Sequence, residues 1–191
     1  MQFLTDFGDQ AMILPLAVIL AFAWAASGWR RGTLAWCMVV PATLAVVLAA
    51  KLTALACGGI LASWQLYSPS GHTASAAVVY GGVLAMLAPR RWQRVFVWGA
   101  PIGVAVVFAV TRVGLRQHTL PDVVVGGLIG VAGAWLLVRA AGLRPRLSPH
   151  AFAVLGAALA TAILFHGTRL NAEYRLLDLS RIVWPLTMCR R

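Results

Sequence analysis

Six long apolar runs set the strongest limit on what this chain can fold into. Each run comes close to the ~17–25 residues that a helix needs to cross the hydrocarbon core of a bilayer. Backbone polar groups in lipid must be satisfied inside the protein, and a single apolar run achieves this only as a helix. We therefore expect an all-α, polytopic membrane protein with six transmembrane helices. The runs cover residues 11–28, 33–50, 73–88, 95–110, 123–138 and 150–165.

The composition excludes a soluble domain of this size. Of the 191 residues 61% are hydrophobic and 11% charged, whereas a soluble domain is about half apolar and about a quarter charged. A net charge of +11 suggests nucleic acid in a soluble protein. Here most arginines fall in short loops, where they set orientation and meet anionic lipid head groups. We expect one transmembrane domain over residues 1–191, membrane lipids around it and no nucleic-acid partner; the sequence defines no oligomeric state.

The loop arginines predict the topology. Residues 52–66 are apolar and short, so they form either a seventh span or a segment along the interface. With six spans all the loop arginines between the runs fall on one side, as the positive-inside rule requires. With a seventh span, Arg30 and Arg31 move to the opposite face from the other six, so six spans is our interpretation. The arginines are Arg30, Arg31, Arg90, Arg91, Arg94, Arg139, Arg144 and Arg146.

This topology gathers the polar residues on the face opposite the arginines. Two polar islands, residues 68–73 and 111–122, land there together with Lys51. In a bacterium this is the periplasmic face of the inner membrane. The N-terminus and a tail over residues 166–191 land there too, and the tail's mixture of arginines and apolar residues indicates a segment on the membrane surface. The same face is oxidising, which allows a disulfide between Cys57 and Cys189.

The first island predicts an anion-binding helix start. Ser70, or Ser68 with Pro69 in the first helical position, caps the helix that follows. Gly71 in the lead-in leaves backbone N–H groups open to an anion at the positive end of the helix dipole. A phosphoryl group bound there would have His72 beside it on the first turn.

The second island admits a structural and a chemical interpretation. Structurally, Asp122 forms a capping box with Thr119, and Arg112 and Arg116 extend to the interface. Chemically, a carboxylate four residues after His118 accepts a hydrogen bond from one imidazole nitrogen and makes the other a nucleophile or base. Two histidines, two arginines, a lysine and the only acidic residue of the central chain share one face. This combination favours a functional site.

A metal site is the competing use of these side chains. His72, His118 and Asp122 supply the three ligands of a catalytic zinc, but no carboxylate then remains for magnesium. The surplus of cationic side chains favours an anionic ligand. We expect no metal and no cofactor. Within the runs, the small residues Gly99 and Gly103, and Gly126 and Gly130, predict close helix packing.

At this point the residues resemble the type 2 phosphatidic acid phosphatase (PAP2) superfamily. Pro69-Ser70-Gly71-His72 is similar to its second signature motif. The third motif is Ser-Arg, five residues, His, three residues and Asp. Here Thr111-Arg112 is followed at that spacing by His118 and Asp122, with Thr111 in place of the usual Ser. The resemblance covers a core of roughly residues 33–140 and extends loosely to the ends.

The first signature motif departs from the family pattern. It reads Lys, six residues, Arg-Pro; Lys51 fits its Lys, but Gly58-Gly59 stand where Arg-Pro belong. One phosphate-binding cation is therefore missing. We hypothesise that Arg116, inside the third motif, compensates for it.

The resemblance implies a metal-independent membrane lipid phosphatase with its active site at the outer face. His118 would attack phosphorus to form a phosphohistidine, Asp122 would orient it, and His72 would protonate the leaving oxygen. Substrates of the class include undecaprenyl diphosphate, phosphatidylglycerol phosphate, phosphatidate and lipid A phosphates. A lipid phosphotransferase of the same fold, or a non-catalytic phospholipid-binding or transport protein, are the alternatives. The substrate phosphate would be held by Lys51, Ser70, Gly71, Arg112 and Arg116.

Overall fold

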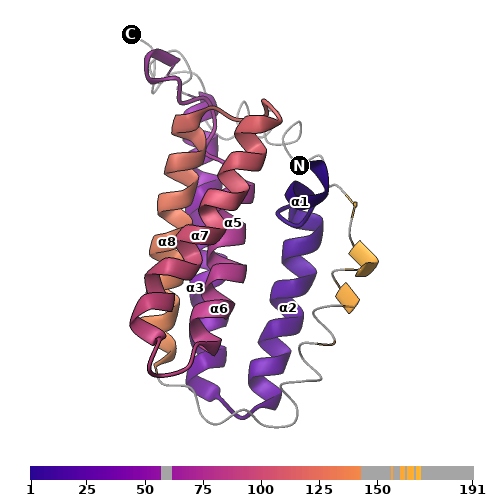
Figure 1. Ribbon diagram of the computed structural model, residues 1–191, viewed down its shortest axis with the longest axis vertical. Coiled ribbons are helices and arrows are strands. Elements are labelled where there is room, and N and C mark those ends of the chain that lie inside the picture. Colours follow the sequence, from indigo (N-terminus) through magenta and orange to yellow (C-terminus); the bar gives the residue numbers. More distant parts are fainter. Residues whose placement is uncertain (57–61, 143–155, 157–159, 162, 166, 169–191) are drawn as a thin grey trace.

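The computed structural model describes residues 1–56, 62–142, 156, 160–161, 163–165 and 167–168. These residues are helical and contain no strand, which confirms the all-α prediction. Figure 1 shows a bundle of nearly parallel rods. The elements are α1 (Gln2–Asp6), α2 (Gln10–Ala26), α3 (Arg30–Ala56), a 3₁₀ turn (Ala62–Trp64), α5 (Gly71–Ala76), a π-helical segment (Ala77–Gly81), α6 (Gly82–Leu87), α7 (Gln93–Gly114) and α8 (Leu120–Ala141).

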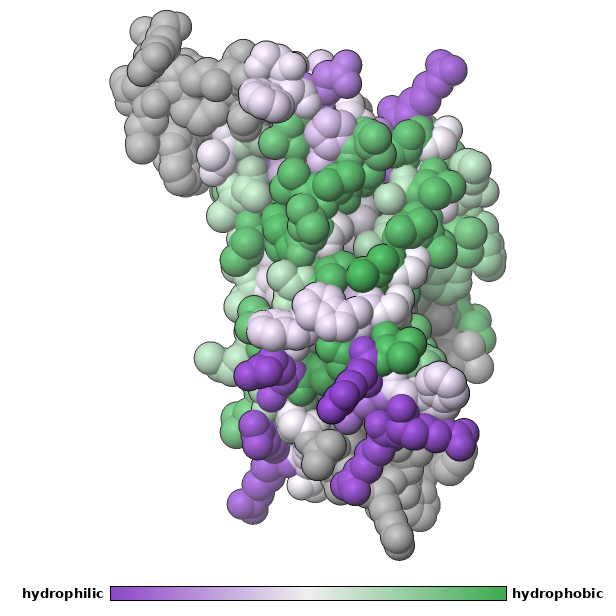
Figure 2. Space-filling view, turned by 60° about the vertical axis from the view of Figure 1, so that its left-hand side comes forward, coloured by the Kyte–Doolittle hydropathy of each residue, from purple (hydrophilic) through white to green (hydrophobic). Residues whose placement is uncertain are grey.

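Five of the six predicted runs form apolar helices. By length and composition α3, α7 and α8 can each cross a membrane, while α2 and the continuous rod Gly71–Leu87 are shorter apolar helices. We call this rod the α5–α6 rod. Large apolar side chains point outward, Phe22, Met38 and Leu128 among them. Figure 2 shows a broad apolar band with hydrophilic side chains at the ends. Such a surface belongs in lipid. The sixth run, residues 150–165, lies mostly outside the described residues.

The chain leaves α3 and enters α5 at the same end of the bundle. The α3 helix runs six residues past its predicted end, from residue 50 to Ala56. A Cβ added at Gly71 would lie 3.6 Å from Lys51 Cε, so the last turns of α3 adjoin the start of α5. A seventh span between them would put these residues on opposite faces. Lys51 and Gly71 therefore lie at one end of the bundle, as the six-span interpretation expects; the number of spans stays a prediction.

The other end of the bundle carries the loop arginines. Arg31 Nε donates to the Ala140 carbonyl oxygen at 2.8 Å and joins the start of α3 to the end of α8. The hydrophilic side chains at the lower end of Figure 2 belong to this region. The prediction that the arginines share one face holds for those described; Arg144 and Arg146 lie outside them. The described ones, all exposed, are Arg30, Arg31, Arg90, Arg91, Arg94 and Arg139.

The two glycine pairs behave differently. A Cβ at Gly126 would lie 2.4 Å from the Ser70 carbonyl oxygen, and one at Gly130 would lie 2.5 Å from that of Ala74. These glycines let α8 touch the backbone of α5, as predicted. A Cβ at Gly103 meets nothing within 4 Å, and one at Gly99 meets only Val95 of its own helix. The packing prediction is wrong for Gly99 and Gly103.

Candidate active site

Asp122 joins the two polar islands. It lies on the first turn of α8, is 2% exposed and forms the predicted capping box with Thr119. Its Oδ1 accepts from the backbone N–H groups of Tyr67 and Ser68 at 3.0 and 2.9 Å. Its Oδ2 accepts from the Thr119 N–H at 3.2 Å, and its carbonyl oxygen accepts from the Ser70 N–H at 2.9 Å. One residue therefore fixes the loop before α5 to the start of α8.

His118 lies beside the second oxygen of the same carboxylate. Its Nδ1 is 3.4 Å from Asp122 Oδ2, and the residue is buried, with 9% exposure. The predicted pairing of residues four apart is thus confirmed. A carboxylate is an acceptor, so it selects the tautomer with a proton on Nδ1. The lone pair is then on Nε2, where a nucleophile needs it.

The first island starts α5 as predicted. Ser70 is the N-cap, and its hydroxyl accepts from the Thr73 N–H at 3.4 Å and from the Thr73 hydroxyl at 3.0 Å. The first N–H groups of a helix have no acceptor within the helix and are available to an anion. His72 sits on this turn. The Ser68 hydroxyl nearby is buried and has no hydrogen-bond partner within the described residues.

Two buried cations lie at the end of the bundle where α5 starts. Lys51, 8% exposed, comes from α3 and lies beside Gly71. Arg112, 6% exposed, comes from the last turn of α7, and its Nη1 donates to the Thr5 hydroxyl at 3.4 Å.

Residues 1–9, here called the N-terminal segment, complete the site. Thr5 contacts Arg112, and a Cβ at Gly8 would lie 3.1 Å from His72 Cβ. Asp9 is the N-cap of α2, since its Oδ1 accepts from the Ala11 N–H at 2.9 Å. Its other oxygen, Oδ2, is 3.8 Å from His72 Nε2. The sequence predicts this terminus at the same end as the two polar islands, but Asp9 is not among the predicted site residues.

Arg116 is the predicted site residue that stays apart. It lies in the turn between α7 and α8, is exposed, and has a left-handed backbone with φ of 54°. The hydrogen bonds found among the described residues do not tie it to the other side chains. Gly58-Gly59, Cys57, Cys189 and nearly all of the tail 166–191 fall outside the described residues.

The assembled site therefore combines an oriented histidine, a second histidine beside a carboxylate, two buried cations and a helix start. Such a set can bind a phosphoryl group, attack it and protonate a leaving oxygen. Among the described residues, no three His, Cys, Asp or Glu side chains come together as a metal-binding group.

One of three comparisons with known proteins gives a match. The family model of the PAP2 superfamily matches residues 53–146, which include both polar islands. Neither the curated proteins nor the solved structures give a match.

Proposed function

The chain belongs to the PAP2 superfamily, and from this premise we propose that it is a membrane lipid phosphatase. It hydrolyses a lipid phosphate or diphosphate without a metal, through a phosphohistidine. The observation that carries the proposal is Asp122, because its carboxylate orients His118 and fixes the loop that precedes His72. This link between the two polar islands supports our proposal that both histidines act on one phosphate at the start of α5.

The first step transfers the phosphoryl group to His118. The Nε2 lone pair attacks phosphorus while the bond from phosphorus to the bridging oxygen breaks. His72 donates a proton to that oxygen, so that a lipid alcohol leaves, or a lipid monophosphate if the substrate is a diphosphate. Asp122 stabilises the positive charge that develops on the His118 ring.

The second step releases inorganic phosphate. A water molecule attacks the phosphohistidine while His72, now neutral, accepts its proton. The P–N bond breaks, and both histidines return to their starting states. The same side chain thus acts as acid and then as base.

The transferred group is held by charge and backbone N–H groups. We propose that Lys51, Arg112 and the first turn at Ser70 and Gly71 hold the equatorial oxygens. Phosphoryl transfer depends mainly on such positioning and electrostatic stabilisation. Arg116 is close in sequence and exposed, so we propose that it turns toward the phosphate only when the substrate is bound, and in this way offsets the absence of an Arg at residue 58.

Asp9 supports the acid role of His72. Lys51 and Arg112 lie at the same end of the bundle and disfavour a protonated imidazole. The Asp9 carboxylate, 3.8 Å from Nε2, favours it. We propose that Asp9 keeps His72 protonated for the first step. It is a positioning residue, because it acts through His72.

The arginine-rich end of the bundle indicates how the protein is oriented in the membrane. The arginine-rich end faces the cytoplasm under the positive-inside rule, so the site opens at the outer face, which in a bacterium is the periplasmic side of the inner membrane. The candidate substrates remain undecaprenyl diphosphate, phosphatidylglycerol phosphate, phosphatidate and lipid A phosphates. They share a phosphate or diphosphate group on an apolar anchor.

The test is phosphate release by detergent-purified protein from a panel of these lipids with EDTA present. We expect release by the wild type and by Gln117→Ala, an exposed neighbour, but not by His118→Ala. Rapid quenching into alkali should trap a phosphate on His118. Release that EDTA abolishes, or that survives His118→Ala, would refute the proposal. Release that requires an added lipid acceptor would identify a phosphotransferase instead.

A further inference from the structure

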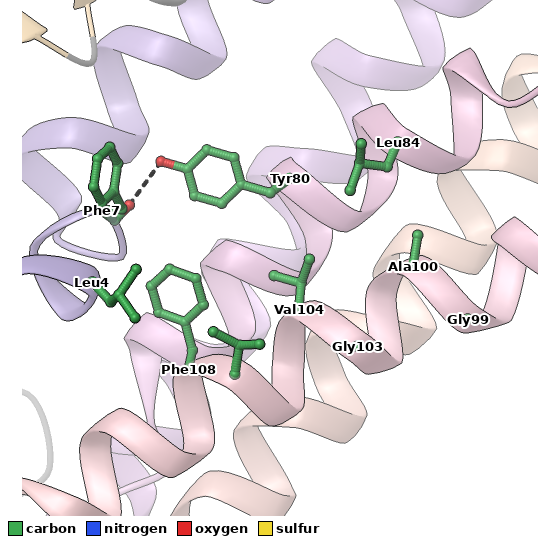
Figure 3. A pocket seen from close by; sticks show the side chains of 10 residues that line it. Leu4, Phe7, Tyr80, Leu84, Gly99, Ala100, Gly103, Val104 and Phe108 are labelled. Carbon is green, nitrogen blue, oxygen red and sulfur yellow. Dashed lines mark hydrogen bonds between the residues drawn. The ribbon is translucent and has the colours of Figure 1, made fainter. Parts of the chain in front are cut away.

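An apolar groove of about 500 Å³ runs along the bundle below the site. Its volume falls within the ~300–1,000 Å³ of ligand pockets. The Tyr80 hydroxyl donates a hydrogen bond of 2.8 Å to the Phe7 carbonyl oxygen (Figure 3). The polar end of the tyrosine is therefore satisfied, and its ring faces the groove with apolar neighbours. The walls include Leu4 and Phe7 of the N-terminal segment, Tyr80 and Leu84 of the α5–α6 rod, and Val104 and Phe108 of α7.

Two glycines make room for the groove. Gly99 and Gly103 line it, and neither packs against a neighbouring helix as Gly126 and Gly130 do. Any larger side chain at Gly103 would project into the groove. The spacing that predicted helix packing instead leaves space beside α7.

One end of the groove adjoins the candidate active site. A Cβ at Gly8 would lie 2.8 Å from Phe108 Cε1 and 3.1 Å from His72 Cβ, so Gly8 packs between the groove wall and the histidine. Arg112 follows Phe108 by one helical turn. From Gly99 to Arg112, α7 spans about 20 Å, which is more than half of the ~30 Å hydrocarbon core.

We infer that this groove holds one apolar chain of the lipid phosphate while its phosphate lies at His118 and His72. The inference rests on the proposed function and adds to it the path of the lipid. A cationic pocket at one end of an apolar groove is complementary to an amphiphile with an anionic head and an apolar tail. The apolar chain of the lipid enters the groove from the bilayer beside α7, so the substrate need not leave the membrane.

The groove does not supply affinity through the hydrophobic effect alone, because the apolar chain of the substrate is already surrounded by lipid in the bilayer. It fixes the direction of the chain and so brings the phosphate to the nucleophile in one orientation. Filling the groove should therefore reduce turnover of long-chain lipids and spare short ones.

The test uses photocrosslinking and kinetics on the full chain in detergent. The probes are a phosphatidate with a diazirine in the middle of one chain and a phosphatidylcholine with the same chain. Gly103→Trp fills the groove. Ile102→Trp is the matched control, because Ile102 is exposed on the same helix and does not line the groove. Kinetics compare dioleoyl with dihexanoyl phosphatidate.

We expect the phosphatidate probe to label groove residues on the order of tenfold more than the phosphatidylcholine probe, because only its phosphate monoester fits the cationic pocket. Gly103→Trp should abolish this labelling and lower kcat/KM for the dioleoyl lipid only; Ile102→Trp should change neither. Equal labelling by both probes would overturn the inference and assign the groove to bulk lipid. Selective labelling without phosphate release would support the groove as the site of the lipid's apolar chain and would refute hydrolysis as the function.

Discussion

Asp122 gives a sharp test at the scale of single residues. Asp122→Asn keeps the size of the side chain but leaves one acceptor oxygen where two are used. We expect kcat to fall on the order of 1,000-fold, because His118 loses the partner that selects its tautomer. The free energy of unfolding should fall by about 1–3 kcal/mol, because buried N–H groups lose an acceptor. Phosphate release and denaturation in detergent measure the two effects.

The control for Asp122 is Thr119→Ser. A serine retains the capping hydroxyl, so both activity and stability should stay close to those of the wild type. An Asp122→Asn variant with full kcat would show that the carboxylate serves only the fold.

Asp9 permits a cleaner separation of fold and chemistry. Asparagine caps helices as well as aspartate does, so Asp9→Asn should retain the bond from Ala11 and the stability of α2. It removes the charge that favours protonated His72. We expect kcat to fall about 10–100-fold with KM unchanged. Phosphate release by both proteins over a range of substrate concentrations measures the two constants.

Thermal unfolding of both proteins in one detergent is the control. A loss of kcat accompanied by an equal loss of stability would mean that Asp9 acts only through the structure.

These residues also separate what sequence can predict from what it cannot. The His118–Asp122 pair is local, since four residues at a helix start bring the side chains together whatever the rest of the chain does. The Asp9–His72 contact depends on how the N-terminal segment packs against α5 and α7. No spacing in the sequence encodes that packing.

At the scale of helices, the glycines provide matched substitutions. Gly126→Ala would place its Cβ 2.4 Å from the Ser70 carbonyl oxygen, whereas Gly103→Ala meets nothing within 4 Å. We expect Gly126→Ala to lower the free energy of unfolding by about 1–3 kcal/mol or more, as overpacking does. Gly103→Ala should leave it unchanged or slightly raised. Thermal unfolding of both variants in one detergent compares them; equal behaviour would contradict the close α5–α8 contact.

Helix positions were predictable from hydropathy, but helix lengths were not. The apolar run ends before Lys51, and so did the predicted helix. The α3 backbone continues to Ala56 because Lys51 is buried against the start of α5 rather than exposed to lipid. Likewise a spacing of four between glycines does not tell which side of a helix meets a neighbour, so Gly99 and Gly103 were misassigned.

At the scale of the whole molecule, orientation is the property to test. In a background with Cys37, Cys57 and Cys189 replaced by serine, we would introduce Gln117→Cys at the site end or Pro89→Cys at the arginine-rich end. Both positions are exposed. A membrane-impermeant maleimide added to intact cells should label the first, and the second only after permeabilisation. The reverse pattern would put the site on the cytoplasmic face.

The shared end of the described loop arginines was predictable, because the arginines alternate with the apolar runs in a way that admits few arrangements. The groove was not predictable from the sequence. It arises where Gly99 and Gly103 of α7 lie beside the N-terminal segment, and that placement is a property of the packed bundle.

The close contact between α5 and α8 makes one part of the candidate active site more rigid than the rest. Because Gly126 and Gly130 bring the two backbones together, the helix that carries His72 and the helix start beside His118 cannot move apart without breaking the fold. The N-terminal segment is bonded to α7 through Arg112 and Thr5, and to the α5–α6 rod through Tyr80 and Phe7. If the proposed function holds, we expect exchange of residues 1–9 to change the range of lipids accepted while the reacting groups keep their spacing.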